Sequence, residues 1–238
     1  MDQPTVTETP TAPATAKVPW WRRPWIVPLW AISALFLVWR VPDYVGYKDP
    51  GALVEMSDYQ HFLIVSGHIM LGGVSLICCC MQLWPWLRTN HPKVHRVTGR
   101  VYVLVVLPAS VLAFFTSFMS ITTPPSGQVG NGILATLWLL TTLIGFRHVR
   151  NGRYADHRRW MIRSFALCFS IVVNRLFIGV YAVGFSPLLD SFYGGSVDRL
   201  ATDAAVASIW SSWVATLVFA EWWMTRRRKP RKRVATAA

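Results

Sequence analysis

Residues 59–84 read YQHFLIVSGHIMLGGVSLICCCMQLW, a stretch without Lys, Arg, Asp or Glu. A helix needs about 20 mostly apolar residues to cross the hydrocarbon core of a bilayer. The stretch is too long and too evenly apolar for a barrel strand, which alternates over about ten residues. It therefore predicts a transmembrane helix, and the rest of the chain can be interpreted outward from it.

Five further apolar segments accompany this one. The predicted spans are Trp25–Val41, Tyr59–Trp84, Thr98–Ile121, Gly132–Phe146, Trp160–Val183 and Thr202–Met224. The fourth span can extend to Arg150, because a long basic side chain can reach the membrane surface. Unpaired backbone polar groups are too costly in lipid for anything but helices and closed barrels. We therefore predict an all-α, polytopic transmembrane helical bundle with six spans.

The basic residues indicate how the bundle is oriented. Most of the 24 Lys and Arg lie in the N-terminal segment, in the gaps after the second and fourth spans, and in the C-terminal tail. Most of the acidic residues lie in the other gaps. Basic loops stay on the cytoplasmic side of a membrane. Both termini are therefore predicted to be cytoplasmic, and we expect the bacterial cytoplasmic (inner) membrane as the location.

Composition divides the chain into three parts. Residues 1–16 are rich in Thr, Pro and Ala and are predicted to be a disordered tail. Residues 17–225 form the predicted six-helix domain, and residues 226–238 form a basic cytoplasmic tail. A net charge of +13 raises the question of nucleic acid. Here the basic residues are explained by the orientation of the chain in the membrane. We therefore expect anionic lipid at the cytoplasmic face as the partner and no nucleic acid.

Three polar residues are predicted at similar depths inside the membrane. His68 lies about nine residues into the second span, roughly 13 Å from its outer end at 1.5 Å per residue. Asn174 and Arg175 lie at a comparable depth in the fifth span, which runs the other way. Polar residues inside a membrane are costly and are candidates for function. We predict that His68, Asn174 and Arg175 line one polar cavity; the alternative is that they only join helices.

A second polar group gathers at the predicted cytoplasmic ends of the spans. It combines histidines, which can move protons or ligate metals, with many arginines. A carboxylate, Glu221, is expected to pair with Arg163 or Arg88, because an unpaired carboxylate is costly there. The candidate ligand-binding residues of this group are His95, Arg96, Arg100, His157 and Arg163. The alternative is that they are ordinary basic flanks with hydrogen bonds between loops.

Other candidates for metal binding are weaker. Cys78, Cys79 and Cys80 are consecutive, and their spacing matches no zinc or iron–sulfur pattern. Together with Cys168 they are expected to pack as small apolar side chains. His61 could bind a cation with Asp58 and Glu55, or it could simply belong to a hydrated helix end.

The chain also resembles a known family. The residues that carry the resemblance are His68, Gly72, Gly73, Gln82, Arg88, His95-Arg96, Gly99-Arg100, Tyr102, His157-Arg158-Arg159-Trp160-Met161, Arg163 and Arg175. They look like the motifs of a widespread bacterial family of predicted multi-pass membrane proteins of unknown function. The resemblance covers roughly residues 59–183 and brings no settled reaction or ligand. The resemblance implies that the site worth testing consists of His68, His95, Arg96, Arg100, His157, Arg163 and Arg175.

Three kinds of function stay open. The first is a transport or small-ligand-binding bundle with a buried His/Arg site. The second is a b-type haem-binding redox protein, for which His95, His148 and His157 share a level and are the candidate ligands. The third is a structural or assembly factor. No motif of a soluble enzyme stands out, and the sequence leaves both enzymatic activity and oligomeric state undecided.

The orientation can be tested with reporter fusions at loop positions. The positive-inside rule predicts alternating sides along the chain. Fusions after Lys48, Gly127 and Ser196 should be external, and fusions after Lys93, Gly152 and Lys232 should be cytoplasmic. External activity of the fusions after Lys93 and Gly152 would contradict the predicted orientation.

Overall fold

The computed structural model describes residues 26–45 and 59–226. Within these ranges every regular element is helical. The long helices are α1 (Ile26–Arg40), α2 (Tyr59–Leu83), α4 (Pro92–Met119), α5 (Pro125–Arg150), α6 (Tyr154–Phe185) and α7 (Val197–Arg226). The short helices are η2 (Val41–Tyr44), α3 (Pro85–Asn90) and η3 (Ser186–Leu188).

Six helical segments in the described residues are long and apolar enough to cross a membrane. This confirms the predicted all-helical fold and the number of spans. Most of these helices extend beyond the predicted apolar segments: α4 begins at Pro92 instead of Thr98, and α5 begins at Pro125 instead of Gly132. Proline is favoured in the first turn of a helix. The residues at which α4 and α5 begin are therefore determined by the position of proline and not by hydropathy. The predictions for residues 1–16 and 227–238 lie outside the described residues.

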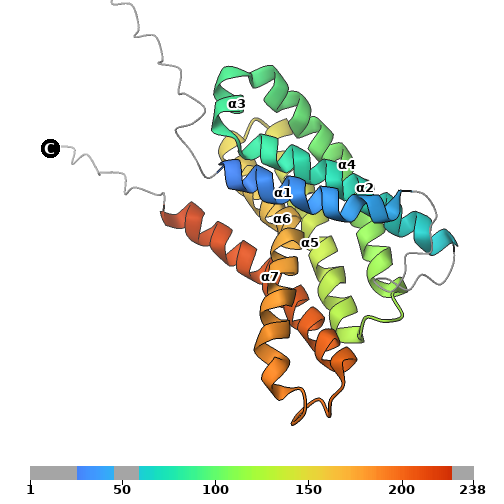
Figure 1. Ribbon diagram of the computed structural model, residues 1–238. Helices are drawn as coiled ribbons and strands as arrows, with labels where there is room; N and C mark the ends of the chain where they lie inside the picture. The colour runs from blue at the N-terminus through green and yellow to red at the C-terminus, as the bar shows by residue number, and fades with distance from the viewer. Residues whose placement is uncertain (1–25, 46–58, 227–238) are drawn as a thin grey trace, which may run out of the picture.

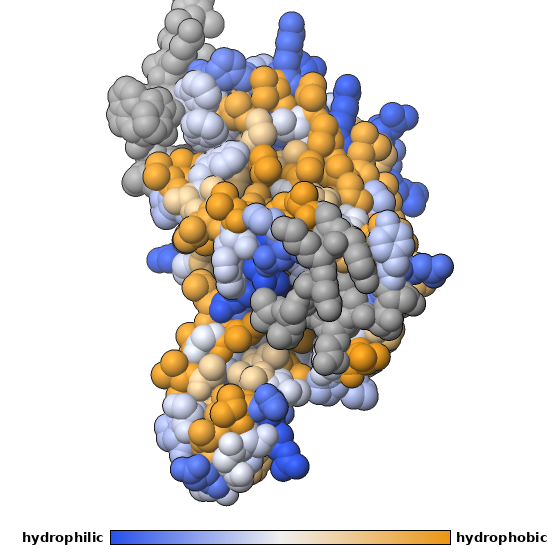
Figure 2. All heavy atoms as spheres, turned by 45° about the vertical axis from the view of Figure 1, so that its right-hand side comes forward, coloured by the Kyte–Doolittle hydropathy of each residue, from blue (hydrophilic) through white to orange (hydrophobic). Residues whose placement is uncertain are grey.

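Consecutive long helices from α4 to α7 pack against one another, and α2 lies against α4 (Figure 1). Helix α6 has a central place, because it contacts α5, α7, α2 and α1. The visible face of the molecule is mostly apolar, with hydrophilic side chains at its ends and another group at mid-height (Figure 2). An apolar outer surface is what a helical bundle needs in lipid.

The core contains one fully satisfied polar network. The hydroxyl of Tyr102 on α4 lies 2.8 Å from that of Ser164 on α6, which lies 2.7 Å from that of Thr142 on α5. Trp138 donates its indole N–H to Tyr102 over 3.2 Å. All four residues are buried. Because each of these four side chains has a hydrogen-bond partner, the network joins three helices without an unsatisfied group of its own.

Small residues bring α7 close to its neighbours. The sequence contains Ala204, Ser208, Ser212 and Thr216 at every fourth position, a spacing that lets membrane helices approach closely. Ala204, Ser208 and Ser212 are at most 2% exposed, and Thr216 is half-buried. The structure thus confirms the prediction that this stripe faces other helices and not lipid.

The contact between α5 and α7 gives a stability prediction. A Cβ on Gly130 would lie 2.9 Å from Ile209 Cγ2 and 3.0 Å from Trp210 Cε2. Trp210 is held by its N–H, which donates to the carbonyl of Ser126. Overpacking of this kind costs about 1–3 kcal/mol, and the preference of a helix for alanine over glycine offsets about 1 kcal/mol of this cost. Gly130→Ala should therefore lower the free energy of unfolding by up to about 2 kcal/mol. The measurement is unfolding of the full chain in mixed micelles.

The matched control is Gly179→Ala in α6, where nothing lies within 4 Å of the added Cβ. Alanine is favoured over glycine in a helix by about 1 kcal/mol, so this change should be neutral or stabilising. Equal effects of the two substitutions would contradict the close approach of α5 and α7.

Candidate functional site

Arg175 is a charged residue placed well inside the longest helix. It lies about ten residues before the end of α6, or about 15 Å along the axis at 1.5 Å per residue. Its Nη1 donates to Oδ1 of Asn174 over 3.0 Å, and Asn174 donates to Oγ of Ser208 on α7 over 2.9 Å. No ion pair to Arg175 occurs among the described residues. The partner of its charge is therefore a neutral amide.

Two residues that the sequence analysis did not select lie near Arg175. Arg40, at the end of α1, and Tyr44, in η2, are close enough to Arg175 to interact with it electrostatically. Helix α1 also contacts α6 directly. A signal for Arg40 was present in the sequence: it is a basic residue at the outer end of the first predicted span, the side on which acidic residues predominate.

His68 has its own partner on another helix. Its Nδ1 donates to the carbonyl of Ala109 on α4 over 2.9 Å. Since a carbonyl oxygen only accepts, the proton of the neutral ring lies on Nδ1 and Nε2 keeps its lone pair. Helices α2 and α6 are in contact, but no hydrogen bond joins His68 to Asn174 or Arg175 in the described chain. The structure thus joins Asn174 to Arg175, and a cavity shared with His68 stays a prediction.

The inner end of the bundle brings two of the predicted histidines together. The ring of His95 on α4 lies within electrostatic range of His157 on α6 and of Arg88. His157 donates from Nδ1 to the carbonyl of Gly145 on α5 over 2.8 Å. Gln82 of α2 donates to the carbonyl of His95 over 2.7 Å and thereby holds the start of α4. Four helices therefore meet around this pair of imidazoles.

Two buried histidine nitrogens at this end lack a hydrogen-bond partner among the described residues. Nδ1 of His95 and Nδ1 of His148 are buried and make no hydrogen bond to any described residue. An unsatisfied buried nitrogen is costly, so these atoms are candidates for contact with a proton donor, water or a metal. Within the described residues no group of three or more His, Cys, Asp or Glu side chains is placed to hold a metal ion.

The three arginines predicted at the inner end have different surroundings. Arg163 of α6 donates from Nε to Glu221 Oε1 over 2.5 Å and from Nη2 to Oε2 over 3.2 Å. Its guanidinium also lies 4.7 Å from the ring centroid of Trp160. The predicted pairing of Arg163 with Glu221 is confirmed. Arg96 and Arg100 are exposed, a placement that suits contact with lipid headgroups.

The remaining candidates for metal binding are buried. Cys78, Cys79, Cys80 and Cys168 are free thiols in the interior, and three of them belong to the hydrophobic core. They pack as small apolar side chains, as the sequence predicts. His61 is only 1% exposed, so it does not lie at a hydrated helix end. Its proposed partners, Glu55 and Asp58, lie outside the described residues.

Comparison with known families agrees with this architecture. The model of a family described as predicted membrane protein (DUF2306) matches residues 65–224, which is more than half of the chain. The chain therefore belongs to the DUF2306 family of predicted membrane proteins. The match continues through most of α7, beyond the segment on which the sequence resemblance was based. No curated protein and no solved structure matches the chain.

Proposed function

We propose that the protein is a membrane bundle that binds a small polar ligand, to hold it or to carry it across, at a site around Asn174 and Arg175. The observation that carries the proposal is the neutral partner of Arg175, a charge inside the apolar part of the bundle. A guanidinium has five N–H donors. Among the described residues only one hydrogen bond uses them, so donors remain for a ligand.

Magnitudes favour this proposal over a purely structural role. An Arg at the centre of a transmembrane helix costs about 2.5–3.5 kcal/mol on insertion, whereas Leu contributes about −0.3 to −0.6 kcal/mol. Hydrogen bonds between membrane helices contribute about 0.6–2 kcal/mol each. One such bond from Arg175, to its own neighbour Asn174, does not offset that difference. A ligand that needs the charge supplies a reason for keeping it.

The inner residues fit the same proposal as the opposite end of a pathway. His95, Arg96, Arg100, His157 and Arg163 lie near the predicted cytoplasmic ends of α4 and α6. We place this end at the cytoplasmic face of a bacterial inner membrane, where its basic residues meet anionic lipid. His68, which hydrogen-bonds to Ala109 on α4 and is predicted at the depth of Arg175, would be a further polar group at the outer site.

The proposal predicts ligand-dependent stabilisation that requires Arg175. The purified full chain in detergent is heated with a panel of small solutes: sodium phosphate, sodium acetate, sodium chloride, glycine and glycerol. A ligand at 100 times its Kd stabilises the folded state by about 2.7 kcal/mol. At least one solute should raise the melting temperature of the wild type and leave that of Arg175→Leu unchanged.

Arg199→Leu is the control, because Arg199 is an exposed arginine on α7. It should respond to the solutes as the wild type does. Equal shifts in wild type and Arg175→Leu for every solute, or no shift at all, would contradict the proposed site and favour a structural or assembly role.

A second candidate function is supported by the inner histidines. His157 donates from Nδ1 to a backbone carbonyl, an arrangement that orients metal-ligating histidines through their other nitrogen. His95 lies within electrostatic range of it, and His148 has a ring nitrogen without a partner among the described residues. These residues could act as axial ligands of a b-type haem, which would supply electron transfer. A visible spectrum and metal analysis of the purified protein distinguish this candidate from the ligand-binding bundle.

A further inference from the structure

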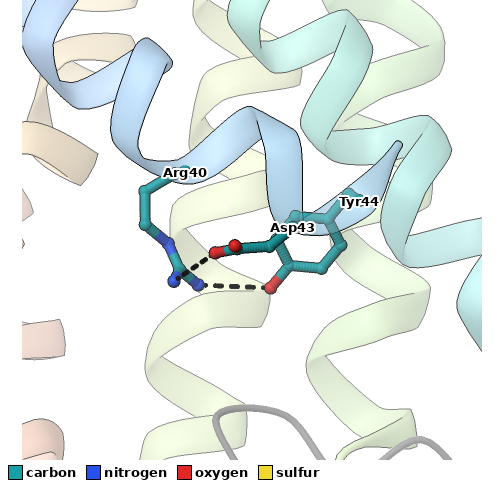
Figure 3. A network of polar contacts seen from close by, with 3 residues as sticks. All are labelled: Arg40, Asp43 and Tyr44. Carbon is teal, nitrogen blue, oxygen red and sulfur yellow. Dashed lines mark hydrogen bonds and ion pairs between the residues drawn. The ribbon is translucent and has the colours of Figure 1, made fainter. Parts of the chain in front are cut away.

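Arg40 is held at the end of α1 by its own neighbours. The chain turns there through the short helix η2, which has Pro42 in its first turn. This turn places Asp43 and Tyr44 beside the guanidinium, as Figure 3 shows. Arg40 donates from Nη1 to Asp43 Oδ2 over 3.1 Å and from Nη2 to the hydroxyl of Tyr44 over 3.2 Å. Its side chain is only 11% exposed.

Arg40 and Arg175 lie within electrostatic range of each other although they are far apart in the sequence. Helices α1 and α6 are in contact, and Arg175 interacts electrostatically with both Arg40 and Tyr44. Asp43 is the only carboxylate paired with either arginine in the described chain. Within the described residues Asp43 pairs with Arg40, and no carboxylate pairs with Arg175. Like charges repel each other more strongly in a medium of low dielectric constant.

The surplus of positive charge and donors defines what would fit. Planar guanidinium groups bind carboxylate and phosphate oxygens through paired N–H donors. The Asn174 amide already holds Arg175 from one side, and Tyr44 holds Arg40. Both groups are thus positioned before a ligand arrives, which reduces the entropy lost on binding.

We infer that Arg40 of α1 and Arg175 of α6 together bind a small oxyanion of the carboxylate or phosphate class, with Asp43 as an internal competitor. The inference rests on the proposed function and names its ligand class. Asp43 suits the role of competitor because it pairs with Arg40 and its side chain is 47% exposed. An incoming anion meets the repulsion of this carboxylate, so neutralising Asp43 should strengthen anion binding.

The test is isothermal titration calorimetry of the full chain in phosphatidylcholine nanodiscs, with sodium phosphate and sodium acetate as probes. Arg40→Leu and Arg175→Leu should each weaken binding of a probe at least about tenfold, which is a modest change on the affinity scale. Asp43→Asn should strengthen it by about tenfold. Arg199→Leu should bind as the wild type does.

Asp43→Asn guards against misfolding as an explanation, since a misfolded protein would not gain affinity. Arg40→Lys and Arg175→Lys keep the charge and lose the planar fork, so they should bind more weakly than wild type and more strongly than the Leu variants. A parallel titration in nanodiscs with phosphatidylglycerol identifies the source of the anion. Loss of phosphate binding there indicates a lipid phosphate in the site, and unchanged binding indicates a free anion.

Two results would overturn the inference. One is the absence of binding of either probe to wild type and to Asp43→Asn in phosphatidylcholine. The other is a wild-type affinity in Arg40→Leu. Two outcomes would leave the proposed ligand site intact and show that the paired-arginine site is wrong. In the first, binding depends on Arg175 but not on Arg40. In the second, only glycerol or another solute that is not an oxyanion stabilises the protein through Arg175.

Discussion

A positive charge in an apolar helical bundle is costly unless polar groups of the protein surround it, and among the described residues Arg175 has only part of the partners that it needs. On one side Asn174 accepts from Arg175 and donates to Ser208, which ties α6 to α7. Arg40 at the end of α1 and Tyr44 in η2 lie within electrostatic range of Arg175. The contact of α6 with α7 thus supports the charge of Arg175 through Asn174, whereas its contact with α1 brings a second positive charge within electrostatic range.

Close packing makes this arrangement possible. Ser208 belongs to the small-residue stripe of α7, and its hydroxyl is also the acceptor for the Asn174 amide. A larger side chain in place of Ser208 would push α6 and α7 apart and would also remove the hydrogen bond from Asn174. The same residue therefore serves the helix contact and the polar site.

The degree of hydrogen bonding separates structural polar groups from candidate functional ones. The network of Tyr102, Ser164, Thr142 and Trp138 is buried and fully partnered, which is the condition of a structural core network. Arg175 has spare donors, and His95 has a buried ring nitrogen without a partner in the described chain. Ligand binding would supply hydrogen-bond partners for such incompletely bonded groups.

Hydropathy in the sequence was sufficient for the number and approximate place of the spans, because apolar length is the dominant constraint in lipid. It could not locate helix ends such as Pro92 and Pro125, where turn chemistry extends the helix beyond the apolar segment. The pairing of Arg163 with Glu221 was also predictable from charge and depth. Arg40 was missed because its role depends on contact between α1 and α6, which pairs residues that no local pattern connects.

The most direct measurement is anomalous diffraction from crystals of the full chain soaked with sodium selenate, a tetrahedral oxyanion with a detectable heavy atom. The account predicts an anomalous peak whose oxygens lie about 2.7–2.9 Å from guanidinium nitrogens of both Arg40 and Arg175, and its absence in Arg175→Leu crystals. A map with no peak between the two arginines, and with each guanidinium fully occupied by protein carboxylates, would contradict the account.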